Sequence, residues 1–249
     1  MTFPAADLMT HHRIVRETLL IDLGTRMRVL SSAPQGGGLR MSRYILNHQV
    51  LPRPVKETKT SRASGSPPRW EDPARYLRRI ALGLGADGDC VGLMTAVPMT
   101  QLVTGRESEG GIWVECYATV GVTNAVRAGE PPRQATDQGA DGTAGTINLI
   151  LITNACLSAS ALVGAVQVAT ESKTGLLRDH AVPSWTGCTG ATGTGTDAVV
   201  VACAVRGRGP WTSYAGTHTA IGSMIGRVTA GCLSQGLARA TRWSGHPPQ

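Results

Sequence analysis

The stretch from Ala191 to Val201, A-T-G-T-G-T-D-A-V-V-V, joins a loop of alternating Thr and Gly to an apolar, β-branched run, with Asp197 at the junction. Glycines let a backbone bend and approach a ligand closely, and the threonines offer hydroxyl and N–H groups there. The apolar run predicts a buried strand that holds the junction still. Loops mounted in this way often carry functional groups, although a plain turn leading into a core strand has the same composition.

Further polar residues gather at the predicted ends of strands and helices, where α/β sheets collect ligand groups. They are Asn124, Thr146 with Asn148, Glu171 with Lys173, Thr194 with Thr196, and Thr217 with His218. The chain contains no G-x-S-x-G, H-E-x-x-H or C-x-x-C sequence, and no Lys follows the Thr-Gly loop. These absences argue against a serine-hydrolase elbow, a zinc hydrolase site and a phosphate-binding loop.

The polar groups fit hydrolysis of an amide, which needs a base, a proton donor for the leaving amine, and donors for the tetrahedral oxyanion. Glu171 or Asp197 could activate water, and His218 could protonate the amine. Thr194, Thr196 or N–H groups of the glycine loop could hold the oxyanion. Each residue also has a structural interpretation, such as solvated helix charge for Glu171, N-cap neighbour for His218 and turn-forming carboxylate for Asp197.

The hydrophobic pattern predicts the elements that position these residues. Strands are expected over 18–23, 26–31, 43–51, 90–97, 111–122 and 146–153, and in the Val199–Val201 run. Helices are expected from Asp72, an N-cap followed by Pro73, to about Leu84, and from Ser158 to about Asp179. A last helix opens at 214–219 and runs to about Thr241. Because turns separate the early strands, the sequence predicts a single α/β domain with a mixed, largely antiparallel sheet packed with helices.

Composition narrows the classes of partner. The chain has 249 residues with a net charge of +7, and its basic residues are spread along it apart from an excess near 53–70. That Pro- and Ser-rich segment predicts a solvated, mobile excursion, and residues 1–13 a loose start. No basic run is interleaved with aromatics, so we expect no nucleic-acid partner. Without a signal-like or membrane-spanning stretch, and with six dispersed cysteines, we expect a cytoplasmic protein with no membrane partner and no metal site.

Seven segments, taken in order, resemble the adenosylcobinamide amidohydrolase family. They are L-S-S-A-P-Q-G-G-G at 30–38, G-L-M-T-A at 92–96, A-T-V-G-V-T-N-A at 118–125, G-T-I-N-L-I-L at 145–151, A-T-E-S-K-T at 169–174, the Thr-Gly loop with its strand, and Y-A-G-T-H-T-A-I-G at 214–222. One segment alone would be weak evidence, but seven in order are specific. Ser172 departs from the family, which more often has Ala between the Glu and the Lys.

The resemblance implies hydrolysis of the amide that joins aminopropanol to a propionate side chain of adenosylcobinamide. Adenosylcobyric acid would be released for coenzyme B12 salvage, with the corrinoid as substrate and no cofactor. The resemblance supplies no catalytic assignment; from the residue chemistry we expect Glu171, Asp197 and His218 to be catalytic, with Glu171 or Asp197 as the base and His218 as the acid. Substrate-binding residues would be Asn124, Thr146, Asn148, Lys173, Thr194, Thr196 and Thr217. A Thr146 nucleophile freed by self-cleavage, a corrinoid-binding protein without turnover, and a homo-oligomer remain open.

Overall fold

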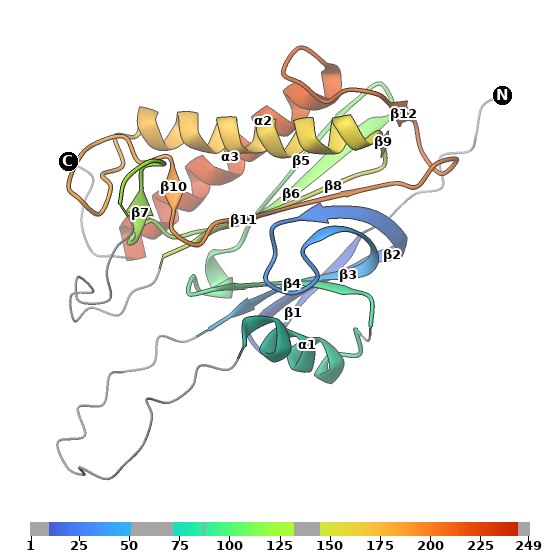
Figure 1. Cartoon of the computed structure of the whole chain (residues 1–249), viewed down its shortest axis with the longest axis horizontal. Helices are drawn as coiled ribbons and strands as arrows, with labels where there is room; N and C mark the ends of the chain where they lie inside the picture. Colours follow the sequence, from blue (N-terminus) through green and yellow to red (C-terminus); the bar gives the residue numbers. More distant parts are fainter. Residues whose placement is uncertain (1–9, 51–71, 87, 132–144, 244–249) are drawn as a thin grey trace, which may run out of the picture.

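The computed structural model describes residues 10–50, 72–86, 88–131 and 145–243. In this part of the chain an eight-stranded sheet is packed with three α-helices (Figure 1). The strands of this sheet are β1 (His11–Val15), β2 (Thr18–Ser31), β3 (Gly38–Gln49), β4 (Cys90–Thr95), β5 (Val103–Glu109), β6 (Ile112–Val120), β8 (Ile147–Thr153) and β11 (Ala198–Cys203). The helices are α1 (Pro73–Gly83), α2 (Ala159–Asp179) and α3 (Ala220–Trp243), with a short 3-10 turn, η1 (Met99–Gln101).

The sheet has the order β4-β3-β2-β11-β8-β6-β5, and β1 pairs with β2. Strands β3 and β4 run parallel, as do β11 and β8, while the other neighbours are antiparallel. Two small two-stranded ladders join β7 (Ala125–Val126) to β10 (Gly193–Thr194) and β9 (Cys156–Leu157) to β12 (Trp211–Thr212). The predicted mixed, largely antiparallel sheet packed with helices is therefore confirmed.

The sheet curls so that its two ends share one core. Ile45 of β3 and Val91 of β4 belong to the same buried cluster as Tyr117 of β6 and Ile150 of β8. On the outer face, α2 and α3 bury a second cluster over β11, β8 and β6. Helix α1 covers β3 and β4 through a third cluster that includes Leu77. The curl leaves β2 and β3 between α1 and α2, as Figure 1 shows.

Local sequence signals explain where the helices begin. Asp72 Oδ1 accepts a hydrogen bond from Arg75 N at 3.0 Å, and Ser158 Oγ accepts one from Ala161 N at 3.0 Å. Both residues are therefore the predicted N-caps. The last helix begins later than its predicted opening at 214–219, because Thr219 Oγ1 caps it by accepting from Gly222 N at 3.0 Å.

The N-terminal strands differ from their prediction. Gly24 does not separate two strands but lies in a bulge of the continuous β2, where the register moves from Asp22 to Met27. Its φ of 72° and its N–H, which donates to Asp22 Oδ1 at 2.9 Å, hold the bulge without reversing the chain. Residues 11–13, part of the start expected to be loose, belong instead to β1, which pairs with β2. Strand β5 was not predicted, because an edge strand with exposed polar residues lacks a strong apolar signal.

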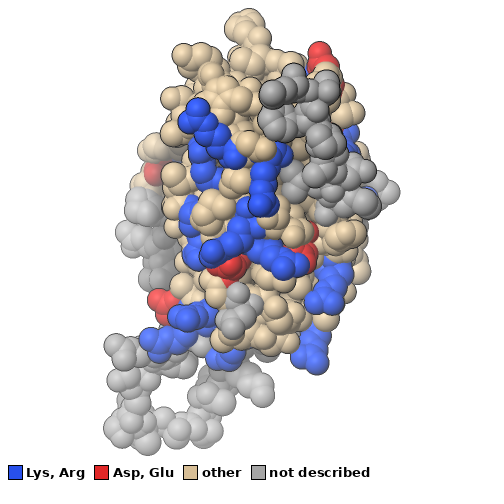
Figure 2. Space-filling model, turned by 90° about the vertical axis from the view of Figure 1, so that its right-hand side faces the viewer, with Lys and Arg blue, Asp and Glu red and all other residues tan. Residues whose placement is uncertain are grey.

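Charge is distributed less evenly on the surface than along the sequence. Figure 2 shows Lys and Arg gathered on one face of the molecule, with fewer Asp and Glu among them. Some of the arginines of β2 and β3 are paired: Arg26 with Asp89, and Arg43 with Asp22 at 2.9 Å. The basic segment 53–70 and residues 132–144 lie outside the described residues. No helix in the described part of the chain is long and apolar enough to cross a membrane.

Candidate active site

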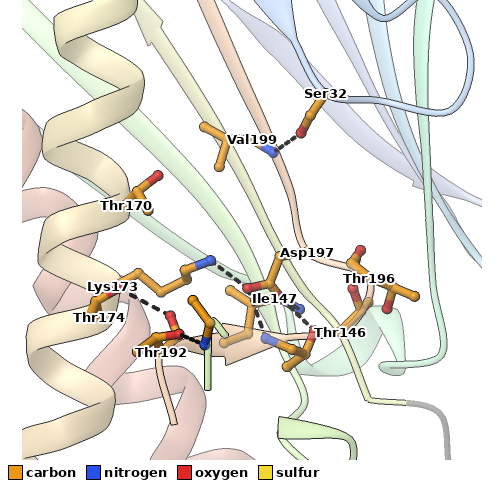
Figure 3. Close-up of polar contacts among 12 residues, drawn as sticks. Ser32, Thr146, Ile147, Thr170, Lys173, Thr174, Thr192, Thr196, Asp197 and Val199 are labelled. Carbon is orange, nitrogen blue, oxygen red and sulfur yellow. Dashed lines mark hydrogen bonds and ion pairs between the residues drawn. The ribbon is translucent and has the colours of Figure 1, made fainter. Parts of the chain in front are cut away.

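Asp197 stands at the start of β11, as predicted, and both of its carboxylate oxygens are occupied. Oδ1 accepts from Ile147 N at 3.0 Å and from Thr194 Oγ1, while Oδ2 accepts from Thr194 N at 3.0 Å and from the Lys173 ammonium (Figure 3). A carboxylate offers about four lone-pair positions, so these four donors fill it. The Asp197 carboxylate thus links the Thr-Gly loop, the start of β8 and the Lys173 side chain of α2.

Lys173 reaches this carboxylate from the middle of α2. Its side chain is 8% exposed and that of Asp197 is 12% exposed, so the ion pair is largely shielded from water. An ammonium has three donors, and Asp197 is the partner that the described residues provide for Lys173. No other partner among the described residues takes up its remaining N–H groups. A shielded cation with free donors can stabilise a negatively charged oxygen far better than an exposed one.

The Gly145–Thr146 and Gly121–Asn124 segments border the same loop. Thr146 Oγ1 donates to Thr196 O at 2.9 Å, and Thr196 Oγ1 lies 3.5 Å from Gly145 O. Asn124 lies beside Gly195, and its buried Oδ1 has no hydrogen-bond partner among the described residues. An unpaired buried acceptor in this place suits a ligand that can donate to it.

A chain of buried amides leads from the site into the core. Asn148 Nδ2 donates to Asn47 Oδ1 at 3.0 Å and to Met94 O at 2.9 Å, and Asn47 Nδ2 donates to Thr119 Oγ1 at 3.0 Å. These contacts tie β8, β3, β4 and β6 together across the curled sheet. Asn47 was not predicted as a site residue, although an amide directly after the apolar stretch Tyr44–Leu46 was a visible signal.

The loop of the first similar segment also meets the start of β11. Ser32 N donates to Val199 O, and Val199 N donates to Ser32 Oγ, each at 3.0 Å. Six of the seven segments with family resemblance therefore converge around the first residues of β8 and β11. The convergence comes from the topology, since β8 and β11 run parallel while β2 ends beside β11.

Glu171 and His218 are placed elsewhere. Glu171 is exposed on α2, where Gln167 Nε2 donates to its Oε1 at 2.8 Å. His218 and Thr217 are exposed near the start of α3. The segment that contains His218 packs near Gly164 of α2, since a Cβ on Gly164 would lie 3.6 Å from Ala215. Lys173 is nine residues further along α2, about 14 Å from Gly164. The structure therefore does not bring Glu171 or His218 to the Lys173–Asp197 pair, and their catalytic roles stay predictions.

A separate hollow lies on the other side of the Gln35 loop. It has a volume of about 490 Å³ and lies between this loop and α1, with Arg40, Arg75 and Arg78 in its lining. It contains none of the predicted site residues. No group of three or more His, Cys, Asp or Glu side chains among the described residues is arranged to hold a metal ion.

The fold and the site together define a mixed α/β protein with a shielded polar centre around the Lys173–Asp197 pair. Comparison with known proteins gives the family. The family model described as adenosylcobinamide amidohydrolase matches residues 5–245. The chain belongs to this family.

Two relatives match nearly the whole chain. One, named adenosylcobinamide amidohydrolase, is from Methanosarcina mazei; it is 30% identical over 236 residues, covering 92% of this chain and 98% of the relative. The other is an uncharacterized protein, MJ1613, from Methanocaldococcus jannaschii, 28% identical over 241 residues, which cover 90% of this chain and 86% of the relative. The resemblance stated from the seven segments is thus confirmed.

Proposed function

We propose that this chain hydrolyses the amide between the corrin propionate and aminopropanol in adenosylcobinamide, forming adenosylcobyric acid for coenzyme B12 salvage. Family membership and the relative's name support an amidohydrolase acting on a corrinoid. The observation that carries the assignment to this site is the shielded Lys173–Asp197 pair, which lies where six of the seven similar segments meet.

In the proposed reaction, water attacks the amide carbon and the carbonyl oxygen becomes an oxyanion. The ammonium of Lys173 donates to this oxyanion through an N–H that Asp197 does not use. The C–N bond then breaks, and aminopropanol leaves after its nitrogen takes up a proton. The products are a free propionate and a free amine, so water supplies both the hydroxyl and the proton.

Asp197 is the base that the geometry supports best, because it lies beside Lys173. All four of its hydrogen-bonding positions are filled, so one donor must turn away before Asp197 can accept a proton from water. The Thr194 hydroxyl can do so, since an O–H rotates while the two backbone donors are fixed by the β8 and β10 ladders. Thr194 would thus switch Asp197 between fixing the loop and taking the proton.

The test measures aminopropanol released from adenosylcobinamide by mass spectrometry, with and without chelator. We expect Lys173→Met and Asp197→Asn each to lower kcat by about 10²-fold or more, the usual cost of removing an oxyanion donor or a base. Glu171→Gln and His218→Ala should have smaller effects, because both residues are exposed and away from the pair. Full turnover by Lys173→Met, with folding verified, would refute the proposal.

Two measurements separate the alternatives. Corrinoid binding without aminopropanol release would identify a binding protein rather than an enzyme. An intact mass equal to that of one uncut chain would exclude a Thr146 nucleophile released by self-cleavage. Thr146 is buried and its hydroxyl is bonded to Thr196 O, which is consistent with a structural role. We also propose a cytoplasmic location without nucleic-acid or membrane partners, and binding to DNA that weakens steeply with salt would contradict it.

A further inference from the structure

Within the described residues, the helices do not fully cover the outer face of the sheet. Helix α3 packs on β5 and β6, and α2 packs on β11. Cross-strand pairing shows which residues continue the α2-facing side of the sheet beyond α2. Val201 of β11 pairs with Leu30 of β2, and Leu30 pairs with Leu39 of β3. Directly opposed residues point to the same face. Val201 is buried under α2, Leu30 is partly buried against the same cluster, and Leu39 is 58% exposed.

The next cross-strand row repeats this pattern with a polar residue in it. Cys203 of β11 pairs with Arg28, and Arg28 pairs with Met41, which is 37% exposed. Nε and Nη2 of Arg28 are shielded from water and have no hydrogen-bond partner among the described residues. Burial raises the pKa of the Cys203 thiol, and the nearby positive charge of Arg28 partly offsets this rise. Leu30, Leu39, Met41 and Arg28 therefore form a mainly apolar strip, called here the uncovered strip.

The side of α2 next to this strip is also apolar. Ser172 and Val168 face α3, since Ser172 Oγ donates to Gly226 O and a Cβ on Gly226 would lie 3.8 Å from Val168. Val163, Val166 and Thr170 share the opposite flank with Lys173, at helical spacings of three, four and three residues. Val163 is 62% exposed. Figure 3 shows Thr170 and Lys173 on the side of α2 toward β11.

The uncovered strip is continuous with the Lys173–Asp197 pair. Asp197 immediately precedes β11, and at about 3.3 Å per residue the partner of Leu30 lies about 13 Å along the strand and the partner of Arg28 about 20 Å. A ligand on the strip therefore has one edge at the reacting groups. Exposed apolar side chains interrupted by a guanidinium that has two nitrogens without a partner among the described residues suit a broad, flat, apolar ring that carries neutral carbonyl groups at its rim.

We propose that the uncovered strip, with Val163 and Val166 of α2, is the platform on which the corrin ring lies, and that Arg28 donates to a side-chain amide carbonyl of the ring. This inference rests on the proposed function for its ligand. It adds Arg28, Leu39 and Met41 as specificity-determining residues that act on the ring and not on the amide being cleaved.

The test measures the dissociation constants of adenosylcobinamide and of its product, adenosylcobyric acid, by equilibrium dialysis, following the absorbance of the corrin. The variants are Leu39→Ser with Met41→Ser, and separately Arg28→Met. The matched control is Leu82→Ser on α1, a leucine that is 51% exposed but lies away from the strip. Leu39, Met41 and Leu82 are each more than one-third exposed, so folding should be preserved in their variants. Arg28 is partly buried, so thermal melting verifies the fold of Arg28→Met before its binding is compared.

We expect the Leu39/Met41 double variant to weaken binding of both corrinoids by about tenfold or more, since each side chain loses buried apolar contact. Arg28→Met should weaken it by about tenfold, and Leu82→Ser by less than about twofold. Equal binding by the double variant and wild type, or an equal loss in the control, overturns the platform even if wild type hydrolyses the amide. Binding that depends on the strip but lacks turnover keeps the platform and rejects the proposed reaction. Absence of corrinoid binding by wild type rejects both.

Discussion

Replacing Asp197 by Asn should destabilise the protein severely, because it leaves the Lys173 ammonium shielded from water without its counterion. The two side chains are 8% and 12% exposed, so little solvent is available to compensate. Removing one partner of a buried ion pair costs about 3–5 kcal/mol, a large part of the 5–15 kcal/mol that typically separates folded and unfolded domains. For a chain of this size, this corresponds to a fall of about 6–20 °C in melting temperature.

The assay is urea unfolding followed by far-UV circular dichroism, with Asp89→Asn as the matched control. Asp89 pairs with Arg26 at the surface, where the two side chains are 29% and 60% exposed, so its replacement should cost at most about 1 kcal/mol. Lys173→Met combined with Asp197→Asn should cost less than the sum of the single changes, because no unpaired charge remains. Additive losses, or an Asp197→Asn cost as small as the control's, would refute the assignment of a buried, coupled pair.

Two further predictions follow from the geometry. Gly193→Ala should destabilise the site and lower turnover, because its Cβ would lie 2.5 Å from Asp197 Oδ2 and 3.1 Å from Lys173 Nζ. Gly195→Ala should be tolerated, because the nearest atom to its Cβ would be 4.0 Å away. The melting temperature and the release of aminopropanol check both variants. His48 is hydrogen-bonded to Thr18 at 2.7 Å and to Tyr76 at 2.9 Å, and burial lowers its pKa. The contribution of neutral His48 to the free energy of unfolding should therefore be fully present above about pH 6.5. It should fall as the pH drops below that value, because the unfolded chain takes up the proton first. Melting temperatures at about pH 7.5 and pH 5.5 should diverge more for wild type than for His48→Gln, and an unchanged difference would contradict this.

Signals that depend on neighbouring residues were predicted well. The caps at Asp72 and Ser158 and the buried strand after the Thr-Gly loop follow from short-range chemistry, and the structure contains all three. The start of α3 was placed too early, because the choice among Thr217, His218 and Thr219 as the cap depends on how the turn packs against Gly222. A Cβ on that glycine would lie 2.0 Å from Gly216 O.

Strand pairing was predicted less well. Nothing in residues 11–15 distinguishes a loose end from β1, because pairing with β2 depends on a partner strand and not on local pattern. The bulge at Gly24 has the same composition as a tight turn. Whether the chain reverses there is decided by β3, which pairs with β2 on both sides of the bulge.

The sequence by itself determined the family, the main elements and the position of Asp197 between the Thr-Gly loop and a buried strand, because these depend on residue type and order along the chain. Only the tertiary structure decided which of Glu171 and Lys173 lies against Asp197. Two residues apart on a helix, their side chains point about 200° apart, and the packing of α2 on β11 turns Lys173 toward Asp197 and leaves Glu171 exposed. The same holds for Asn47 and Asn148, which are 101 residues apart in sequence and meet because the sheet curls.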